Sequence, residues 1–148
     1  MKKTIISTCL VTIFMAGVAN ASYRCPETAF CPDIYPSHCR VSENVLEFHP
    51  LGGQQLLSRA GLTLTFFRAG ISEGSSSIPA EVVCVYHNDK SHDMVDFHAN
   101  SKVGKFKPVS VAIMSNWKKI DSIDWNCASD WSSGSLSNNQ CLFEVPSK

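Results

Sequence analysis

Cysteine constrains this chain more than any other feature of its sequence. Cys9 lies in an apolar run at the N-terminus, and the six other cysteines follow it: Cys25, Cys31, Cys39, Cys84, Cys127 and Cys141. An even number of cysteines in a small exported chain is typical of a disulfide framework, here of three bridges. The spacings are too wide for a zinc knuckle, and the sequence has no C-x-x-C redox motif. We therefore expect three disulfides, no metal ligands and no cofactor.

The N-terminus has the features of a secretory signal. Two lysines precede the uncharged and mostly apolar run Thr4–Val18, and Ala19-Asn20-Ala21 then supplies the small residues that signal peptidase recognises. The run is short for a membrane span, which needs about 20 apolar residues. We predict that residues 1–21 are a cleaved signal peptide. Residues 22–148 should form one domain, periplasmic or secreted, with no membrane span.

The predicted mature chain has a nearly balanced charge. Removal of Lys2 and Lys3 reduces the 13 basic residues to 11, against 13 acidic residues. This balance gives no electrostatic footprint for nucleic acid. A protein or a glycan is therefore the expected partner, and the sequence indicates neither its identity nor the oligomeric state.

The segment 22–40 contains three of the cysteines, together with Pro26, Pro32 and Pro36. Three cysteines cannot all pair with one another, so at least one bridge must join this segment to the rest of the chain. Because the segment has three prolines and no clear hydrophobic period, we expect it to be irregular and to be anchored covalently.

The remainder of the chain has the patterns of short β-strands. Leu62, Leu64 and Phe66 alternate with threonine, which is typical of a strand with one buried face. Further strands are expected at Ala80–His87, Asp93–His98, Val109–Met114, Ser122–Trp125 and Gln140–Val145, with a loop at Ile71–Pro79, an early strand at Val41–Phe48 and a helical turn at Gln54–Ala60. Short strands between Gly-, Ser-, Asn- and Pro-rich turns predict a mainly β fold, a compact antiparallel β-sandwich or barrel stapled by disulfides.

Three of the five histidines lie in the stretch HNDKSHDMVDFH, residues 87–98. A hairpin with the loop Asn88–Ser91 would place His87 opposite His92, while His98 would lie about 20 Å from the tip at about 3.3 Å per residue. Ligands of one metal ion lie about 2 Å from it, so the three histidines cannot share an ion. No nucleophile motif such as G-x-S-x-G accompanies them, and we interpret the cluster as the polar rim of a hairpin. The same register turns three side chains towards the core: Val82, Cys84 and Tyr86.

The stretch WKKIDSIDWNCASDWSSGSLSNNQCLF, residues 117–143, contains all three tryptophans. Aromatic rings beside amides and carboxylates are typical of sugar-binding surfaces, but large aromatics also fill the cores of small β domains. We assign Trp117 and Trp125 to the core. Trp131 lies in a polar loop and is the centre of a predicted binding surface, whose residues are Asp130, Trp131, Asn138 and Asn139.

Two pairings remain open for the last cysteines. A direct Cys127–Cys141 bridge would close a loop of about 15 residues, stabilise the chain by about 3 kcal/mol and tether the predicted binding surface. Alternatively, Cys84 pairs with Cys141, and Cys127 holds the N-terminal segment. We favour the direct bridge.

Short motifs between residues 60 and 145 give the chain a resemblance to other proteins. They are Phe67-Arg68-Ala69, the strand VVCVYHND, Trp117, Cys127 and the closing NNQCLF. In this order they resemble a family of small exported bacterial proteins of unknown function that contain cysteines. The resemblance implies export and a β fold, and it implies no catalytic residue.

These observations favour a small exported binding or interaction protein whose ligand the sequence does not name. Two alternatives stay open. One is a small secreted hydrolase that uses His87 or His98 with an aspartate. The other is a protease inhibitor that presents the loop between Cys127 and Cys141. A binding protein is the preferred interpretation, because no catalytic motif accompanies the export signal and the cysteines.

Overall fold

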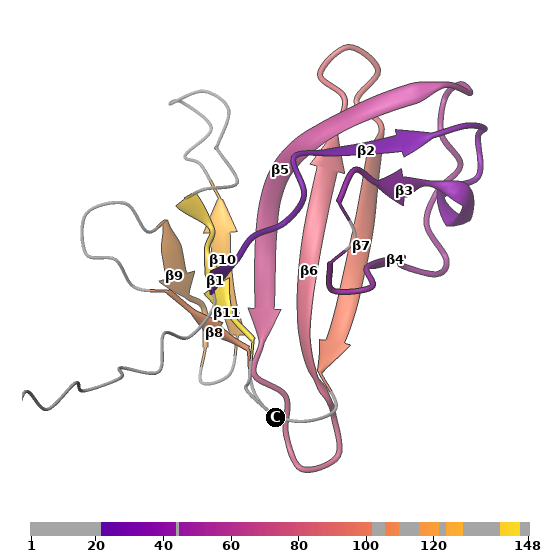
Figure 1. The fold of residues 1–148 in the computed structure, drawn as a ribbon. Helices are drawn as coiled ribbons and strands as arrows, with labels where there is room; N and C mark the ends of the chain where they lie inside the picture. The colour runs from indigo at the N-terminus through magenta and orange to yellow at the C-terminus, as the bar shows by residue number, and fades with distance from the viewer. Residues whose placement is uncertain are drawn as a thin grey trace, which may run out of the picture.

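The computed structural model describes residues 22–43, 45–101, 106–109, 116–121, 124–128 and 140–145. Within these ranges the chain is mainly β, as predicted (Figure 1). Its elements are β1 (Ser22–Tyr23), β2 (Thr28–Cys31), the 3-10 helix η1 (Pro36–His38), β3 (Arg40–Val41), β4 (His49–Pro50), β5 (Leu62–Ser72), β6 (Ala80–His87), β7 (Met94–Ser101), β8 (Lys107–Pro108), β9 (Trp117–Lys119), β10 (Asp124–Ala128) and β11 (Phe143–Glu144). In this part of the chain, no helix has the length and apolar character that a membrane crossing requires.

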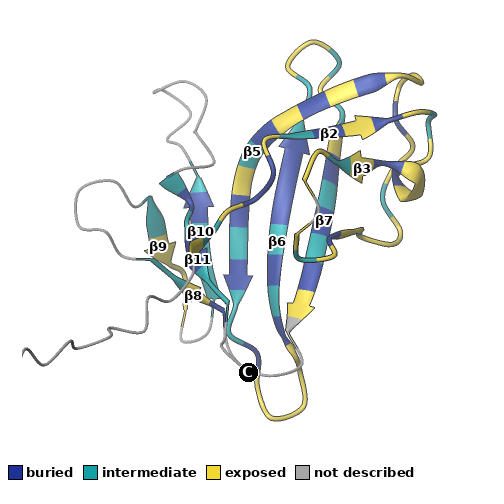
Figure 2. Cartoon of the chain, in the orientation of Figure 1, coloured by how far each residue is buried: buried dark blue, intermediate teal, exposed yellow. Residues whose placement is uncertain are grey.

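β5 is the strand around which the main sheet is built. One of its edges pairs with β6, and its other edge is shared between β2, along 62–65, and β10, along 68–72. The strand curves between these halves, so that the antiparallel sheet is barrel-like and nearly closed (Figure 1). A β-bulge at Phe67 accompanies the bend and increases the local twist. The bulge also shifts the buried positions, which are Leu62, Leu64 and Phe66 before it and Ala69 and Ile71 after it (Figure 2).

The hairpin β6–β7 has the predicted core face but a different register. The three β6 side chains that were expected to face the core are buried. His87 pairs with Met94 rather than with His92, so every pair is displaced by two residues along β7. A displacement by two keeps each side chain on its face, because successive side chains of a strand point to opposite sides.

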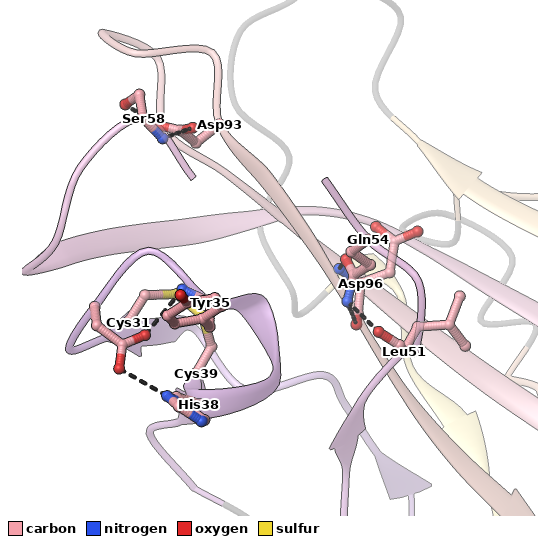
Figure 3. Close-up of a disulfide and its surroundings, with 10 residues drawn as sticks. Cys31, Tyr35, His38, Cys39, Leu51, Gln54, Ser58, Asp93 and Asp96 are labelled. Carbon is pink, nitrogen blue, oxygen red and sulfur yellow. Dashed lines mark hydrogen bonds and ion pairs between the residues drawn. A yellow bond between two sulfur atoms is a disulfide. The ribbon is translucent and has the colours of Figure 1, made fainter. Parts of the chain in front are cut away.

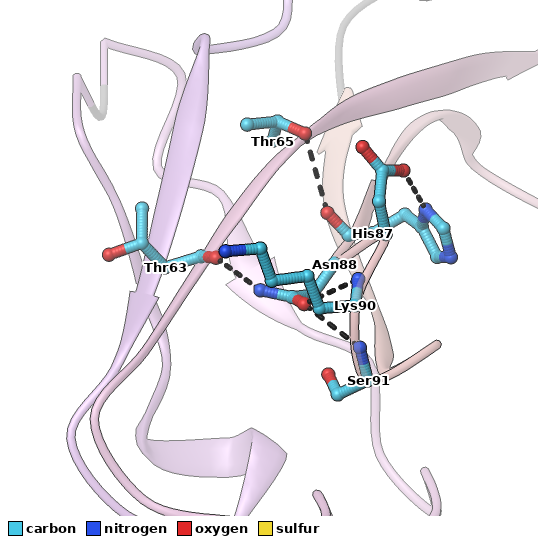
Figure 4. A network of polar contacts seen from close by, with 7 residues as sticks. Thr63, Thr65, His87, Asn88, Lys90 and Ser91 are labelled. Atoms are coloured by element: carbon cyan, nitrogen blue, oxygen red, sulfur yellow. Dashed lines mark hydrogen bonds and ion pairs between the residues drawn. The ribbon is translucent and has the colours of Figure 1, made fainter.

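The Asn88 side chain explains this displacement. Its Oδ1 accepts hydrogen bonds from the backbone N–H groups of Lys90 and Ser91, at 3.1 Å each (Figure 4). The backbone of Asn88 stays within the ladder, and its N–H donates to Asp93 O at 3.0 Å. His92 then closes the turn with a left-handed φ of 59°. The loop therefore begins one residue later than predicted.

The segment 22–40, which was predicted to be irregular, has short regular elements between its irregular stretches. This segment supplies β2, which pairs with both β3 and β5, and it also contains η1. The prolines delimit these elements rather than prevent them. Pro26 and Pro32 lie outside β2, and Pro36 is the first residue of η1, where a missing N–H group costs no helical hydrogen bond.

Two other predicted elements are also absent. The expected strand Val41–Phe48 stops at Val41, and a left-handed φ of 55° at Glu47 interrupts the extended backbone. The expected helical turn Gln54–Ala60 does not form, and the Leu57 N–H instead donates to Ile34 O at 2.9 Å.

The remaining strand predictions differ mainly in their limits. The strand Ala80–His87 coincides with β6, whereas β5 extends to Ser72 because it has partners on both edges there. The predicted last strand, Gln140–Val145, is reduced to β11, and the short strands β8 and β9 were not predicted. The predicted strand Val109–Met114 lies outside the described residues except for its first position.

Disulfides join the parts of this fold at three places: Cys25–Cys84, Cys31–Cys39 and Cys127–Cys141. One bridge therefore joins the segment 22–40 to the rest of the chain, as the number of cysteines required. The third bridge is the pairing that we favoured over Cys84–Cys141. All six cysteines are buried, and they belong to one continuous core.

The bridge to β6 lies beside a buried tyrosine. The Tyr86 hydroxyl donates a hydrogen bond to Pro26 O at 3.0 Å, and its ring packs edge-on against Phe66 and Phe97. Burial raises the pKa of the Tyr86 phenol, which stays protonated as this bond requires. The N-terminal segment is thus fixed to β6 by a covalent bond and by a hydrogen bond two residues away.

Candidate functional site

The sequence predicts a binding surface of four residues that lie outside the described ranges: Asp130, Trp131, Asn138 and Asn139. Only the two ends of their loop are described. Cys127 and Cys141 hold these ends with their Cα atoms 5.7 Å apart. The prediction of a binding surface here stays a prediction.

The two tryptophans assigned to the core lie at its margin. Trp117 and Trp125 are half-buried and pack against the core. Trp117 Nε1 donates to Leu142 O at 2.8 Å, and Trp125 Nε1 donates to Glu73 Oε1 at 2.9 Å. Lys119 Nζ also covers the Trp125 ring, 5.4 Å from its centroid. Because both indole N–H groups have protein partners, these tryptophans serve the structure rather than offering donors to a sugar.

The histidines of the hairpin tip do approach each other. The rings of His87 and His92 lie 6.1 Å apart, and Phe67 from the bulge lies 5.4 Å from the His87 ring. His87 Nδ1 is 3.1 Å from Asp89 Oδ1, a carboxylate that is 91% exposed. An ion pair with so exposed a partner is weak, because water screens the two charges.

His98 lies on the far part of β7 and has its own carboxylate partner. Its Nδ1 is 2.8 Å from Glu81 Oε1, and His49 is its cross-strand neighbour. The hydrolase alternative expected an aspartate here, whereas the partner is a glutamate. Across the described ranges, no three His, Cys, Asp or Glu residues are placed to hold a metal ion, and no imidazole is hydrogen-bonded to a hydroxyl group.

The surface with the best-defined geometry was missed by the sequence analysis. It surrounds the loop that the Cys31–Cys39 bridge closes, where the two Cα atoms are 4.1 Å apart (Figure 3). Backbone bonds within the loop run from His38 N to Tyr35 O and from Cys39 N to Pro36 O, at 3.0 Å each. The loop is therefore held by a covalent bond and by the single turn of η1.

Asp33 adds a polar brace to this loop. Its Oδ1 accepts a hydrogen bond from Tyr35 N at 2.9 Å, and its Oδ2 accepts one from His38 Nδ1 at 2.7 Å. The pKa of the Asp33 carboxyl is lowered, first by the bond with His38 and then by the bond from Tyr35. Both carboxylate oxygens are used inside the loop, so this carboxylate positions its neighbours rather than acting on a ligand.

Four side chains around the loop are directed into solvent, and we call them the loop surface: Phe30, Tyr35, His38 and Arg40. Phe30 and Tyr35 are 52% and 50% exposed, unusually open for large aromatics. Phe30 and Arg40 are cross-strand partners on the same face of β2 and β3. Phe30, His38 and Arg40 line an open cleft of about 560 Å³, and the Tyr35 ring packs on His38 at 5.6 Å.

A sequence signal for this surface exists, although it is easily misread. The nine residues CPDIYPSHC contain two prolines and two cysteines, which suggested an irregular segment. The informative detail is the Asp33-x-Tyr35 spacing after a proline, because an aspartate commonly caps the N–H group two residues later.

Comparison of the chain with known protein families, with curated proteins and with solved structures finds no significant match.

Proposed function

We propose that this protein is a small exported binding protein that contacts its partner through the loop surface. One observation carries the proposal: two aromatic rings are half exposed on backbone that β2, a disulfide and Asp33 hold in place. Tyrosine and arginine are enriched among the residues that dominate binding energy at interfaces. A loop that is already ordered loses little conformational entropy when it binds.

Export is part of the same proposal. It is supported by the three disulfides, which persist in oxidising compartments and are rare in the cytosol, and by the N-terminal lysine pair, apolar run and Ala-x-Ala sequence.

A hydrolase has less support. The His38–Asp33 pair resembles the histidine and aspartate of a catalytic triad, but its side chains are 58% and 42% exposed, so water screens the charges that such a site would use.

The test begins with the oxidised protein as bait against a glycan array and against extracellular proteins. Any partner is then measured against Tyr35→Ser and Phe30→Thr, with Ile78→Ser as the matched control. Ile78 is 60% exposed and lies in the β5–β6 loop, away from the loop surface. We expect each loop-surface variant to weaken binding by about tenfold or more, and the control to leave it unchanged. A partner whose affinity is the same for all three variants would contradict the proposal.

A further inference from the structure

A second cleft lies between the segment 54–58 and the hairpin β6–β7. Its volume is about 630 Å³, and its walls are the segment 54–58, the turn 91–94, Arg68 and Asp96. It shares no lining residue with the loop surface, so a ligand in this cleft would not contact the loop surface.

The walls of this cleft are fixed by hydrogen bonds between segments far apart in the sequence. Gln54 Oε1 accepts from Asp96 N at 2.6 Å, and Gln54 Nε2 donates to Asp96 O at 3.0 Å (Figure 3). The amide side chain thus replaces a neighbouring strand along this part of β7. Ser58 N and Oγ donate to the two oxygens of Asp93, at 2.8 and 2.6 Å. The cleft is therefore preformed and does not depend on a mobile wall.

The cleft contains two opposite charges that do not pair with each other. Arg68, Val85 and Asp96 occupy one row across β5, β6 and β7, and Val85 is a buried residue between the two charged ones. Burial raises the pKa of the half-buried Asp96 carboxyl, and the charge of Arg68 partly offsets that rise. Among the described residues, no donor is hydrogen-bonded to this carboxylate, and no cation lies within 4.0 Å of it.

We propose that this cleft binds a free α-amino acid with an aliphatic side chain. The ligand's ammonium group would bind Asp96, and its carboxylate would bind Arg68. A half-buried carboxylate without a donor is unfavourable, and an ammonium group removes that cost. Two exposed apolar side chains at the cleft, Leu56 and Met94, receive the aliphatic part.

Arg68 and Asp96 lie on one face of the sheet, two strands apart, so their Cα atoms are about 9.6 Å apart at about 4.8 Å per strand. Both side chains line the same cleft, and the long Arg68 side chain can shorten the gap between the two charged groups. A small zwitterion carries an ammonium and a carboxylate group within one molecule, so a single ligand can contact both charges.

An NMR titration of the full oxidised chain with L-leucine tests the proposal, followed at the backbone amides of 54–58 and 91–96. N-acetyl-leucine lacks the ammonium group and leucinamide lacks the carboxylate, so each analogue removes one proposed contact. We expect saturable shifts with leucine and binding that is weaker by about tenfold or more for each analogue. The proposal is overturned if leucine gives no saturable shift, or if both analogues bind as well as leucine.

Two variants assign the contacts. In Asp96→Asn, leucine should bind no better than N-acetyl-leucine. In Arg68→Gln, leucine should bind no better than leucinamide. Glu81→Gln is the matched control. Glu81 is, like Asp96, a half-buried carboxylate, but it lies on β6 and outside the cleft, so this substitution should leave leucine binding unchanged. If both variants still bind leucine more tightly than either analogue, the assigned contacts are wrong.

Discussion

The bridges Cys25–Cys84 and Cys31–Cys39 begin six residues apart and have different consequences for the molecule. The first joins residues 59 apart in sequence and lies in the core beside Tyr86. The second joins residues 8 apart and closes a loop whose aromatic side chains are half exposed. A bridge between distant segments stabilises the whole fold, whereas a bridge between near neighbours mainly fixes local shape.

The largest expected effect follows from removing the long-range bridge. Replacing Cys25 and Cys84 together by alanine frees a loop of about 60 residues, which should lower the free energy of unfolding by about 4 kcal/mol. Urea unfolding followed by tryptophan fluorescence measures the loss as a lower midpoint. A midpoint equal to that of the unaltered protein would show that this bridge does not hold the fold.

Removing the short-range bridge should lower stability less than removing the long-range bridge does, and it should weaken partner binding more. Replacing Cys31 and Cys39 together by alanine frees a loop of about nine residues, so the expected loss is about 2.5 kcal/mol. The same urea titration measures it, and the partner assay of the loop surface should show weaker binding. If this double variant is destabilised more than the Cys25 and Cys84 double variant, the distinction between the two bridges fails.

A single hydrogen bond beside the Cys25–Cys84 bridge should also contribute to stability. Tyr86→Phe removes the hydroxyl that donates to Pro26 O and leaves a buried carbonyl without that partner. The expected loss is about 1–2 kcal/mol in the free energy of unfolding. Tyr35→Phe, at a half-exposed tyrosine, is the control and should change stability by less than about 0.5 kcal/mol. Equal effects of the two substitutions would argue against the role given to Tyr86.

The smallest expected effect is a pH dependence confined to the short-range loop. The pKa of Asp33 is lowered in the folded protein. The stabilisation that its carboxylate gives to the loop is therefore fully present at a pH above the ordinary aspartate pKa of about 3.9. The contribution is lost as the pH falls through the lower folded value. The Tyr35 amide shift should report this change in an NMR titration, and Asp33→Asn should abolish it. A midpoint at or above about 4 would contradict the brace.

The sequence was informative wherever alternation and cysteine count decide the outcome. The core face of β6, the β5 alternation before Phe67 and the bridge between the N-terminal segment and the body were all predicted. These features depend on burial, and burial follows the residue pattern. The β-bulge at Phe67, which lies in the pairing of β5 with β6, could not be predicted in this way, because an extra residue in one strand depends on which strand pairs with it.

Three of the differences from the predictions involve a polar side chain that bonds to backbone. Asn88 displaced the β6–β7 register by capping Lys90 and Ser91. The Gln54 side chain bonds to both backbone groups of Asp96, where a helical turn was predicted. Asp33 ordered a loop that was expected to be irregular. Such bonds depend on which segments meet in space, and a hydrophobic pattern does not contain that information.

Amide hydrogen exchange on the Cys31→Ala, Cys39→Ala double variant tests whether the Cys31–Cys39 bridge acts only on its own loop. We predict that the amides at 38 and 39, which bond to Tyr35 O and Pro36 O, lose their protection. The ladder amides of β6 and β7 should stay protected, weakened by no more than the loss of about 2.5 kcal/mol in global stability. If the loop amides keep their protection, or if the β6–β7 ladder loses protection along with them, the Cys31–Cys39 bridge does not act locally.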